Sequence, residues 1–299
     1  MLSLKKFKNL FYSARPRQWS KNLICLSAVI ITPVSNFEQI ENIIWVTLGF
    51  IFASSFIYQI NDLVDLQFDK LDSIKCKRPL ASGILSKREI IYFSIFLFIL
   101  FIFCALKSSN EAFFITSSYT LIQILYCKLL KNIPIFDIYA IALGFILRAL
   151  SGVIAVGAIP SSWFLITTGF MALFLATQKR KFELARVSKD ETFNLRAVLR
   201  IYTKSFLEKL EILSLTSGFI TYVFWASGPI LNGANSSYML LTSPILLAGI
   251  NRYQLMSQVK NGDIYLGESP TIFLFQDKGI QSILLFWLLL TLLITYANF

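Results

Sequence analysis

The 299-residue sequence contains no histidine. This absence excludes Ser-His-Asp and Cys-His nucleophilic systems, and it also excludes metal sites with imidazole ligands. The four cysteines (Cys25, Cys76, Cys104 and Cys127) show no C-x-x-C spacing, so neither a disulfide framework nor a zinc site is indicated. Any catalysis must therefore use carboxylates, cations, amides, hydroxyls or a metal ion held by oxygen.

Charge is scarce as well. Only 15% of the residues are charged, 56% are apolar, and the mean hydropathy is +0.64. This composition is typical of a polytopic membrane protein and not of a soluble domain. The apolar runs predict nine membrane-spanning helices, at about 22–35, 43–60, 89–106, 112–126, 135–158, 162–178, 210–230, 237–256 and 280–297. We therefore expect an all-α bundle formed by a single membrane domain over residues 1–299, in which the short run at 112–126 extends into its flanks.

The 28 lysines and arginines predict the orientation of this bundle. Nearly all of them precede the first span or lie in the even-to-odd loops; only Lys107 lies in a loop of the opposite side, and Arg148 lies inside a span. By the positive-inside rule the basic segment 1–21 is cytoplasmic and the C-terminus is outside. We expect a multi-pass protein of the inner (plasma) membrane. Its net charge of +11 then reflects topology and attraction to anionic lipid, and not nucleic-acid binding, because the cations alternate with spans.

The stretch NDLVDLQFDKLDSIKCKRPLASG (61–83) concentrates charge directly after a predicted span. If the helix continues over 61–72, Asn61, Asp65 and Asp69 recur every four residues and share one face. Asp62 precedes Asp65 by three residues, and Asp72 follows Asp69 by three. Like charges at these spacings repel one another, so a cation is expected to compensate them.

Two interpretations of this acidic face remain open. Mg²⁺ prefers oxygen ligands and is typically held by one or two carboxylates together with substrate phosphates, which favours a metal–diphosphate site. Lys75 and Arg78 follow at once, and Arg offers a two-pronged fork for phosphate. The alternative is a solvated helix end with salt bridges to Lys70, Lys75 and Arg78.

Other cations are candidates for binding phosphate groups. A charged residue inside a span, such as Arg148, usually faces the bundle interior and marks a site. Asp137, Gly144 and Arg148 are spaced seven and four, so they share a face on which Gly144 leaves room. A structural pair of Arg148 with a buried carboxylate or with backbone carbonyls is the alternative. Further candidates stand at the expected cytoplasmic ends of other spans: Arg17, Lys21, Tyr126, Lys128, Lys179 and Arg180.

The pattern N-D-x-x-D-x-x-x-D over 61–69, followed by KRPLASG (77–83), resembles the first aspartate-rich motif of the UbiA superfamily of intramembrane prenyltransferases. Other segments are similar to one subgroup, the decaprenyl-phosphate phosphoribosyltransferases. These segments are RPRQWSKN (15–22), LKNIPIFDIYAIALGFILRALSG (130–152), QKRKFE (178–183), RY (252–253) and GESP (267–270). The resemblance implies a nine-helix bundle that uses Mg²⁺.

The resemblance also implies a reaction: transfer of 5-phosphoribose from 5-phosphoribosyl 1-diphosphate to a polyprenyl phosphate, for a cell-envelope glycan precursor. Asn61, Asp65 and Asp69 would hold the Mg²⁺-diphosphate, with Asp62 in support. The expected substrate-binding residues are Arg78, Lys75 and Lys179 for donor phosphates, Lys128, Arg148 and Arg17 for the donor 5-phosphate or the lipid phosphate, and Lys21, Tyr126 and Arg180 around them.

One departure from the superfamily pattern concerns the region after the sixth span. It reads KRKFELARVSKDE and has no D-x-x-x-D, the second acidic motif of prenyl-transferring members. This favours the phosphoribosyltransferase subgroup over the first alternative, a prenyltransferase that attaches a polyprenyl chain to an aromatic or other small acceptor. A lipid or solute transporter is a third hypothesis, but it explains neither the aspartate register nor the one-sided cations. The oligomeric state stays open.

Overall fold

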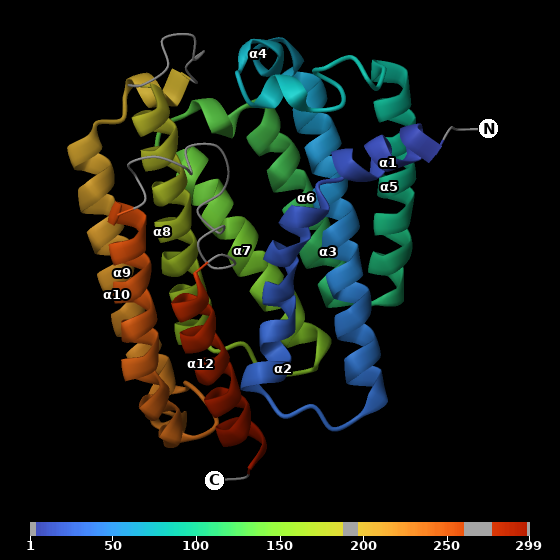
Figure 1. The fold of residues 1–299 in the computed structure, drawn as a ribbon. Helices are drawn as coiled ribbons and strands as arrows, with labels where there is room; N and C mark the ends of the chain where they lie inside the picture. Colours follow the sequence, from blue (N-terminus) through green and yellow to red (C-terminus); the bar gives the residue numbers. More distant parts are fainter. Residues whose placement is uncertain (1–3, 188–196, 260–276, 298–299) are drawn as a thin grey trace.

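The computed structural model describes residues 4–187, 197–259 and 277–297, and over these residues it is helical, without strands (Figure 1). In chain order the helices, with η for short 3-10 helices, are α1 (Leu4–Ser13), η1 (Pro16–Leu26), α2 (Ser27–Ile31), α3 (Phe37–Val64), α4 (Leu66–Leu71), η2 (Lys75–Lys77), α5 (Lys87–Lys107), α6 (Asn110–Lys128), η3 (Leu130–Asn132), α7 (Phe136–Ala155), α8 (Ser162–Val187), η4 (Ala197–Arg200), α9 (Lys204–Ala226), η5 (Pro229–Leu231), η6 (Ser237–Thr242), α10 (Ser243–Val259) and α12 (Lys278–Tyr296). The segment GESP (267–270) lies outside the described residues.

Helical structure coincides with every predicted apolar run. The short run at 112–126 extends into both flanks as expected, because α6 covers Asn110–Lys128. The first run differs from the prediction, since η1 begins at Pro16 and α2 already ends at Ile31. Thr32 is extended, with φ −134° and ψ 127°, which is the conformation favoured before a proline such as Pro33.

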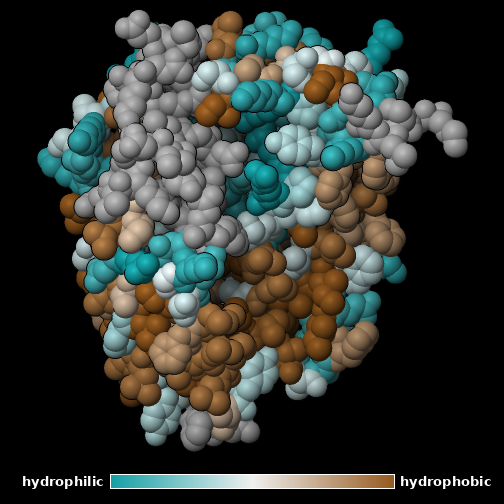
Figure 2. Space-filling view, viewed as in Figure 1, coloured by the Kyte–Doolittle hydropathy of each residue, from teal (hydrophilic) through white to brown (hydrophobic). Residues whose placement is uncertain are grey.

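Four of the described helices, α3, α5, α7 and α12, are long and apolar enough to cross a membrane. Apolar side chains cover the flank of the bundle in Figure 2, and hydrophilic side chains gather mainly at the end where α4 lies. This is the surface of a multi-pass membrane protein. α1 lies at the α4 end and α12 ends at the opposite one (Figure 1), as an odd number of spans requires. The count of nine and the cytoplasmic orientation stay predictions.

Helix α7 lies at the centre and packs against η1, α3, α6 and α8. Gly152 of α7 allows a very close approach to η1, because a Cβ at this position would lie 2.0 Å from the carbonyl oxygen of Cys25. Outer pairs are α3 with α5, α8 with α9, and α10 with α12, while α12 also contacts α2. The close packing of η1 on α7 brings the N-terminal segment beside Arg148.

The acidic stretch is two helices and not the single one predicted over 61–72. Helix α3 ends at Val64, and Asp65 has φ −89° and ψ 5° before α4 begins. Two hydrogen bonds nevertheless keep the four-residue spacing: the Asp65 amide donates to the Asn61 carbonyl at 2.8 Å, and the Asp69 amide donates to the Asp65 carbonyl at 2.8 Å. The acidic residues therefore stay on neighbouring positions despite the break.

Candidate active site

A polar cavity of about 900 Å³ lies between α1, η1, the end of α3, the segment after α4, and α6, α7 and α8. Among the described residues that line it, nine are lysine or arginine and only two, Asp62 and Glu183, are acidic. The nine cations are Lys8, Arg15, Arg17, Lys21, Lys75, Lys77, Arg78, Arg148 and Lys179. Such an excess of one sign in a cleft focuses the field and attracts anions.

The cavity gathers most of the predicted site residues from distant parts of the chain. It is lined by Asn61, Asp62, Arg17, Lys21, Lys75, Arg78, Tyr126, Arg148 and Lys179. The remaining predicted residues, Asp65, Asp69, Lys128 and Arg180, are not among its lining. Lys128 is exposed at the end of α6, so its predicted contact with substrate phosphate has no support in its position.

Arginines pair with Asp62 and Asp69 of the acidic stretch. Asp62 and Asp69 are buried, at 4% and 3% exposure. Nη1 of Arg78 lies 3.2 Å from Oδ1 of Asp62 and 2.6 Å from Oδ2 of Asp69, and Arg15 also pairs with Asp62. Burial raises the pKa of Asp69, and the Arg78 guanidinium opposes that shift. These carboxylates therefore share a compensating cation at the wall of the cavity.

The other two aspartates have different partners. Oδ1 of Asp65 lies 2.5 Å from Nζ of Lys131, and both residues are buried. Oδ1 of Asp72 accepts hydrogen bonds from the amides of Ile74 and Lys75, each at 2.9 Å, and its Oδ2 lies 3.3 Å from Nζ of Lys75. The salt bridges of the alternative interpretation are thus present for Lys75 and Arg78. Their carboxylate partners are buried, whereas the two cations remain partly exposed.

A divalent cation such as Mg²⁺ needs oxygen ligands, which the protein, phosphates and water can supply. Among the described residues, no three carboxylate or thiol side chains lie close enough together to form a metal site. Asp62 and Asp69 nevertheless contact the same nitrogen of Arg78, which shows that the two carboxylates lie close enough together to share a cation. Because Mg²⁺ needs only one or two carboxylates alongside phosphates and water, these residues fit a Mg²⁺ ion that binds together with a diphosphate. Asp65, a predicted ligand, is turned toward Lys131 instead.

Arg148 is a buried cation whose hydrogen-bond partners among the described residues are all neutral. Its Nε donates to Oδ1 of Asn22 at 2.7 Å, its Nη1 to the Gly144 carbonyl at 2.9 Å, and its Nη2 to the Tyr119 hydroxyl at 2.6 Å. It is 6% exposed and pairs with no carboxylate among the described residues. Gly144 leaves room beside Arg148, since a Cβ there would lie 3.0 Å from Nε2 of Gln123 and 3.3 Å from the Tyr119 ring. Asp137, which was predicted to share a face with Arg148, forms an ion pair with Arg180 and not with Arg148.

Arg180 is fully buried beside the cavity and not in it. Its Nε lies 2.6 Å from Oδ2 of the buried Asp137, its Nη1 lies 2.5 Å from Oε2 of Glu183, and its Nη2 donates to the Tyr126 hydroxyl at 3.2 Å. The Tyr202 hydroxyl donates to Oδ1 of Asp137 at 2.5 Å. Direct substrate contact, predicted for Arg180, is thus replaced by support of two lining residues, Tyr126 and Glu183.

Replacing Arg180 by glutamine is expected to destabilise the protein by about 3–5 kcal/mol, because Asp137 would stay buried without a charged partner. The measurement is the apparent unfolding temperature of the purified variant in detergent. A double variant, Arg180→Gln with Asp137→Asn, removes both charges and should recover much of that loss. An Arg180→Gln variant as stable as the unmodified protein would contradict the assigned role.

Three residues of the site were missed as site residues by the sequence analysis: Arg15, Lys131 and Glu183. Arg15 stands in a basic segment before Pro16, and its backbone is left-handed at φ 55°, which is uncommon outside glycine. Lys131 is only three residues from the predicted Lys128, but it is the one that turns inward. Glu183 lies in QKRKFE as a single carboxylate, and no repeated acidic spacing in that segment marks it as a site residue.

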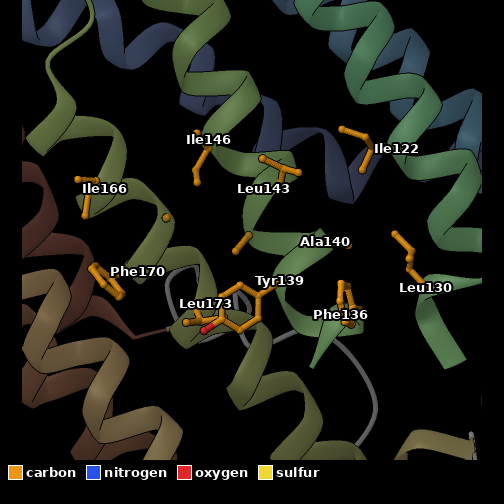
Figure 3. Close-up of a pocket in the computed structure, with 12 residues that line it drawn as sticks. Ile122, Leu130, Phe136, Tyr139, Ala140, Leu143, Ile146, Ile166, Phe170 and Leu173 are labelled. Carbon is orange, nitrogen blue, oxygen red and sulfur yellow. The ribbon is translucent and has the colours of Figure 1, made fainter. Parts of the chain in front are cut away.

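A second, apolar cavity of about 500 Å³ lies between α6, α7 and α8. Figure 3 shows Phe136, Tyr139 and Leu143 of α7 between Ile122 of α6 on one side and Ile166 and Phe170 of α8 on the other. No described residue lines both cavities, because α7 presents Ile141, Phe145 and Arg148 to the polar one and other positions to the apolar one. The apolar cavity is therefore separate from the cationic site.

Solved structures share this fold. The chain superposes on a UbiA homolog from Archaeoglobus fulgidus bound to GPP and Mg²⁺ with a TM-score of 0.69, at 20% identity, covering 96% of this chain and 99% of that one. A UbiA homolog from Aeropyrum pernix superposes with a TM-score of 0.63, at 11% identity, covering 94% and 96% of the two chains. At these identities the likeness establishes the fold.

Curated relatives are similar over nearly the whole chain. A decaprenyl-phosphate phosphoribosyltransferase from Corynebacterium glutamicum is 28% identical over 94% of this chain and 85% of the relative. One of the same name from Mycolicibacterium smegmatis is 28% identical over 93% and 90%. Residues 22–265 match the family described as the UbiA prenyltransferase family. The all-helical membrane fold and this match, which covers most of the sequence, agree: the chain belongs to the UbiA prenyltransferase family.

Proposed function

We propose that the protein transfers 5-phosphoribose from 5-phosphoribosyl 1-diphosphate to a polyprenyl phosphate and releases diphosphate. The observation that carries the proposal is the cavity in which nine cations from distant segments adjoin the buried Asp62–Arg78–Asp69 bridge. Two phosphorylated substrates bring many negative charges to one place, and this lining can neutralise them. The names of the curated relatives support the same choice of donor and acceptor.

The donor diphosphate would lie against the α3–α4 junction. Asp62 and Asp69 would hold Mg²⁺ there, and the bound ion would neutralise charge that develops on the departing diphosphate. Arg78 already touches both carboxylates, and its remaining N–H groups can donate to phosphate oxygens in a fork. Lys75 and Lys77 line the same side of the cavity and add positive charge. The protein thereby orients the leaving group and stabilises it electrostatically.

The acceptor phosphate would approach from the side of η1 and α7. A monoalkyl phosphate has a second pKa of about 6, so its oxygen is charged at neutral pH and needs no protein base to attack the sugar carbon. This agrees with a sequence that has no histidine. Arg148 and Lys21 line the cavity there and lie within electrostatic reach of each other, so together they can hold a doubly charged phosphate.

We include orientation and location in the proposal: the cavity faces the cytoplasm from the inner membrane, where a soluble sugar diphosphate is available. The distribution of lysine and arginine supports this. Cys76, a partly exposed cysteine after α4, allows this orientation to be measured. Its labelling by a membrane-impermeant maleimide is compared between inverted and right-side-out vesicles.

The reaction is tested with purified protein, Mg²⁺, radiolabelled phosphoribosyl diphosphate and polyprenyl phosphates of several chain lengths. We expect label in the lipid fraction, together with release of one diphosphate per lipid formed, and loss of both after chelation by EDTA. No labelled lipid at any chain length would contradict the proposal. Product from a prenyl diphosphate and an aromatic acid under the same conditions would support the prenyltransferase alternative instead.

A further inference from the structure

Glu183 is an unexpected residue in a cavity that attracts anions. It is one of only two acidic residues among the described lining, and the other, Asp62, is covered by Arg15 and Arg78. A carboxylate beside phosphate-binding cations repels phosphate and weakens their field. A hydrogen-bond donor on the ligand would be attracted to this carboxylate and would offset the repulsion of phosphate.

The position of Glu183 is set by buried neighbours. Its Oε2 lies 2.5 Å from Nη1 of Arg180, whose side chain is fully buried and is itself held by Asp137 at 2.6 Å. The side chain of Glu183 lines the cavity and keeps 20% exposure, so part of the carboxylate-bearing side chain is accessible from the cavity. The Tyr126 hydroxyl, 3.2 Å from Nη2 of Arg180, lies in the same wall.

A fixed carboxylate is suited to hydroxyl groups. An ionised carboxylate only accepts hydrogen bonds, and because its two oxygens offer about four acceptor sites it can bind several donors at once. Acidic side chains bind the ribose hydroxyl of dinucleotides for the same reason. A prenyl diphosphate has no hydroxyl groups, whereas a ribosyl diphosphate has two adjacent ones on its ring.

We infer that Glu183, positioned by Arg180, accepts hydrogen bonds from the ring hydroxyls of the sugar donor and makes the cavity selective for a glycosyl diphosphate over a prenyl diphosphate. This inference rests on the proposed function and assigns the choice of donor to one residue. The diphosphate binds at the α3–α4 junction, and the sugar lies toward α8, between that junction and Glu183.

The test compares two stable carbocyclic analogues of phosphoribosyl diphosphate, one with both ring hydroxyls and one without them. Their dissociation constants are measured by calorimetry with Mg²⁺ on the purified full-length protein, alongside inorganic diphosphate. Hydrogen bonds to a charged group are worth about 1.5–3 kcal/mol in general, so we expect the unmodified protein to prefer the hydroxylated analogue by about 10- to 100-fold. In Glu183→Gln this preference should fall to about threefold or less, with unchanged affinity for diphosphate.

Glu211→Gln is the matched control. Glu211 is a buried carboxylate on α9 that pairs with Lys181 of α8 and accepts from Gln178 at 2.6 Å, but it does not line the cavity. This variant should keep the full preference. If Glu183→Gln does not fold, Glu183→Asp keeps the charge for Arg180 and withdraws the carboxylate by one carbon, and it should lose most of the preference.

Two negative results can be told apart. If the unmodified protein binds both analogues no better than diphosphate and transfers no ribose, the proposed function itself fails. If it prefers the hydroxylated analogue and both Glu183 variants prefer it equally, the donor assignment stands and the role of Glu183 is overturned.

Discussion

Asp69→Asn is expected to lower phosphoribosyl transfer by about 10²- to 10³-fold, the usual loss when one preorganised electrostatic group is removed from a reaction site. The asparagine keeps an acceptor for Arg78, which still pairs with Asp62, so the fold should persist. The substitution removes one of the two carboxylates, Asp62 and Asp69, that are proposed to hold the Mg²⁺ ion. Binding of Mn²⁺ in the presence of diphosphate, measured by electron paramagnetic resonance, should weaken in parallel.

Asp72→Asn provides the control within the same acidic stretch (61–83). Its side chain accepts from the amides of Ile74 and Lys75, and asparagine can accept from the same amides. Activity should therefore stay within about threefold of the unmodified protein. Equal losses in the two variants would show that general negative charge matters and not the particular place of Asp69. Full Mn²⁺ binding by Asp69→Asn would remove Asp69 from the metal site.

Arg148→Gln is the second substitution with a large expected effect: transfer should fall by about 100-fold or more while the protein stays folded. Arg148 lies inside the bundle with Asn22, Tyr119 and the Gly144 carbonyl as partners. Removing its charge leaves no buried anion behind, and water in the adjoining cavity can replace the lost hydrogen bonds. The affinity for the acceptor phosphate should fall most, read as a higher KM for polyprenyl phosphate.

The stability of Arg148→Gln separates a binding role from a structural one. We expect a change of about 1 kcal/mol at most, or ~2–4 °C in apparent unfolding temperature. The same substitution at Arg180 should cost several times more, because the fully buried Asp137 loses its counter-charge. If Arg148→Gln unfolds like Arg180→Gln, then Arg148 serves the fold. If it is stable and fully active, the cation is dispensable for the reaction.

The sequence analysis was most successful where local patterns determine the structure. Apolar runs of membrane length predicted helices that are present, and the residue before Pro33 ended the first one earlier than expected. The spacing of Asn61, Asp65 and Asp69 predicted a shared helical face, and the backbone hydrogen bonds retain that spacing across the break at Asp65. Hydrophobic periodicity and peptide geometry are local, so they can be inferred without knowing what packs nearby.

Ion-pair partners that are distant in the sequence could not be inferred in this way. Asp65 pairs with Lys131, 66 positions away, while nearby Lys70 remains exposed, and Asp137 pairs with Arg180 and not with Arg148 on its own helix. Burial makes the difference. An exposed charge is solvated by water and can stay unpaired at little cost in free energy. A buried charge needs a partner at hydrogen-bond distance, and the crossing of the helices determines which partner is available.

The amino-acid sequence by itself determined that this is a multi-spanning helical chain, that histidine chemistry is excluded, and that an acidic stretch with four-residue spacing follows an apolar run. Only the tertiary structure decided which cations face the cavity, that Arg180 supports its wall from behind, and that Glu183 stands among the cations. The physical reason is that composition and spacing set the kinds of groups available, whereas close packing, as where Gly152 meets Cys25, sets which of them can meet.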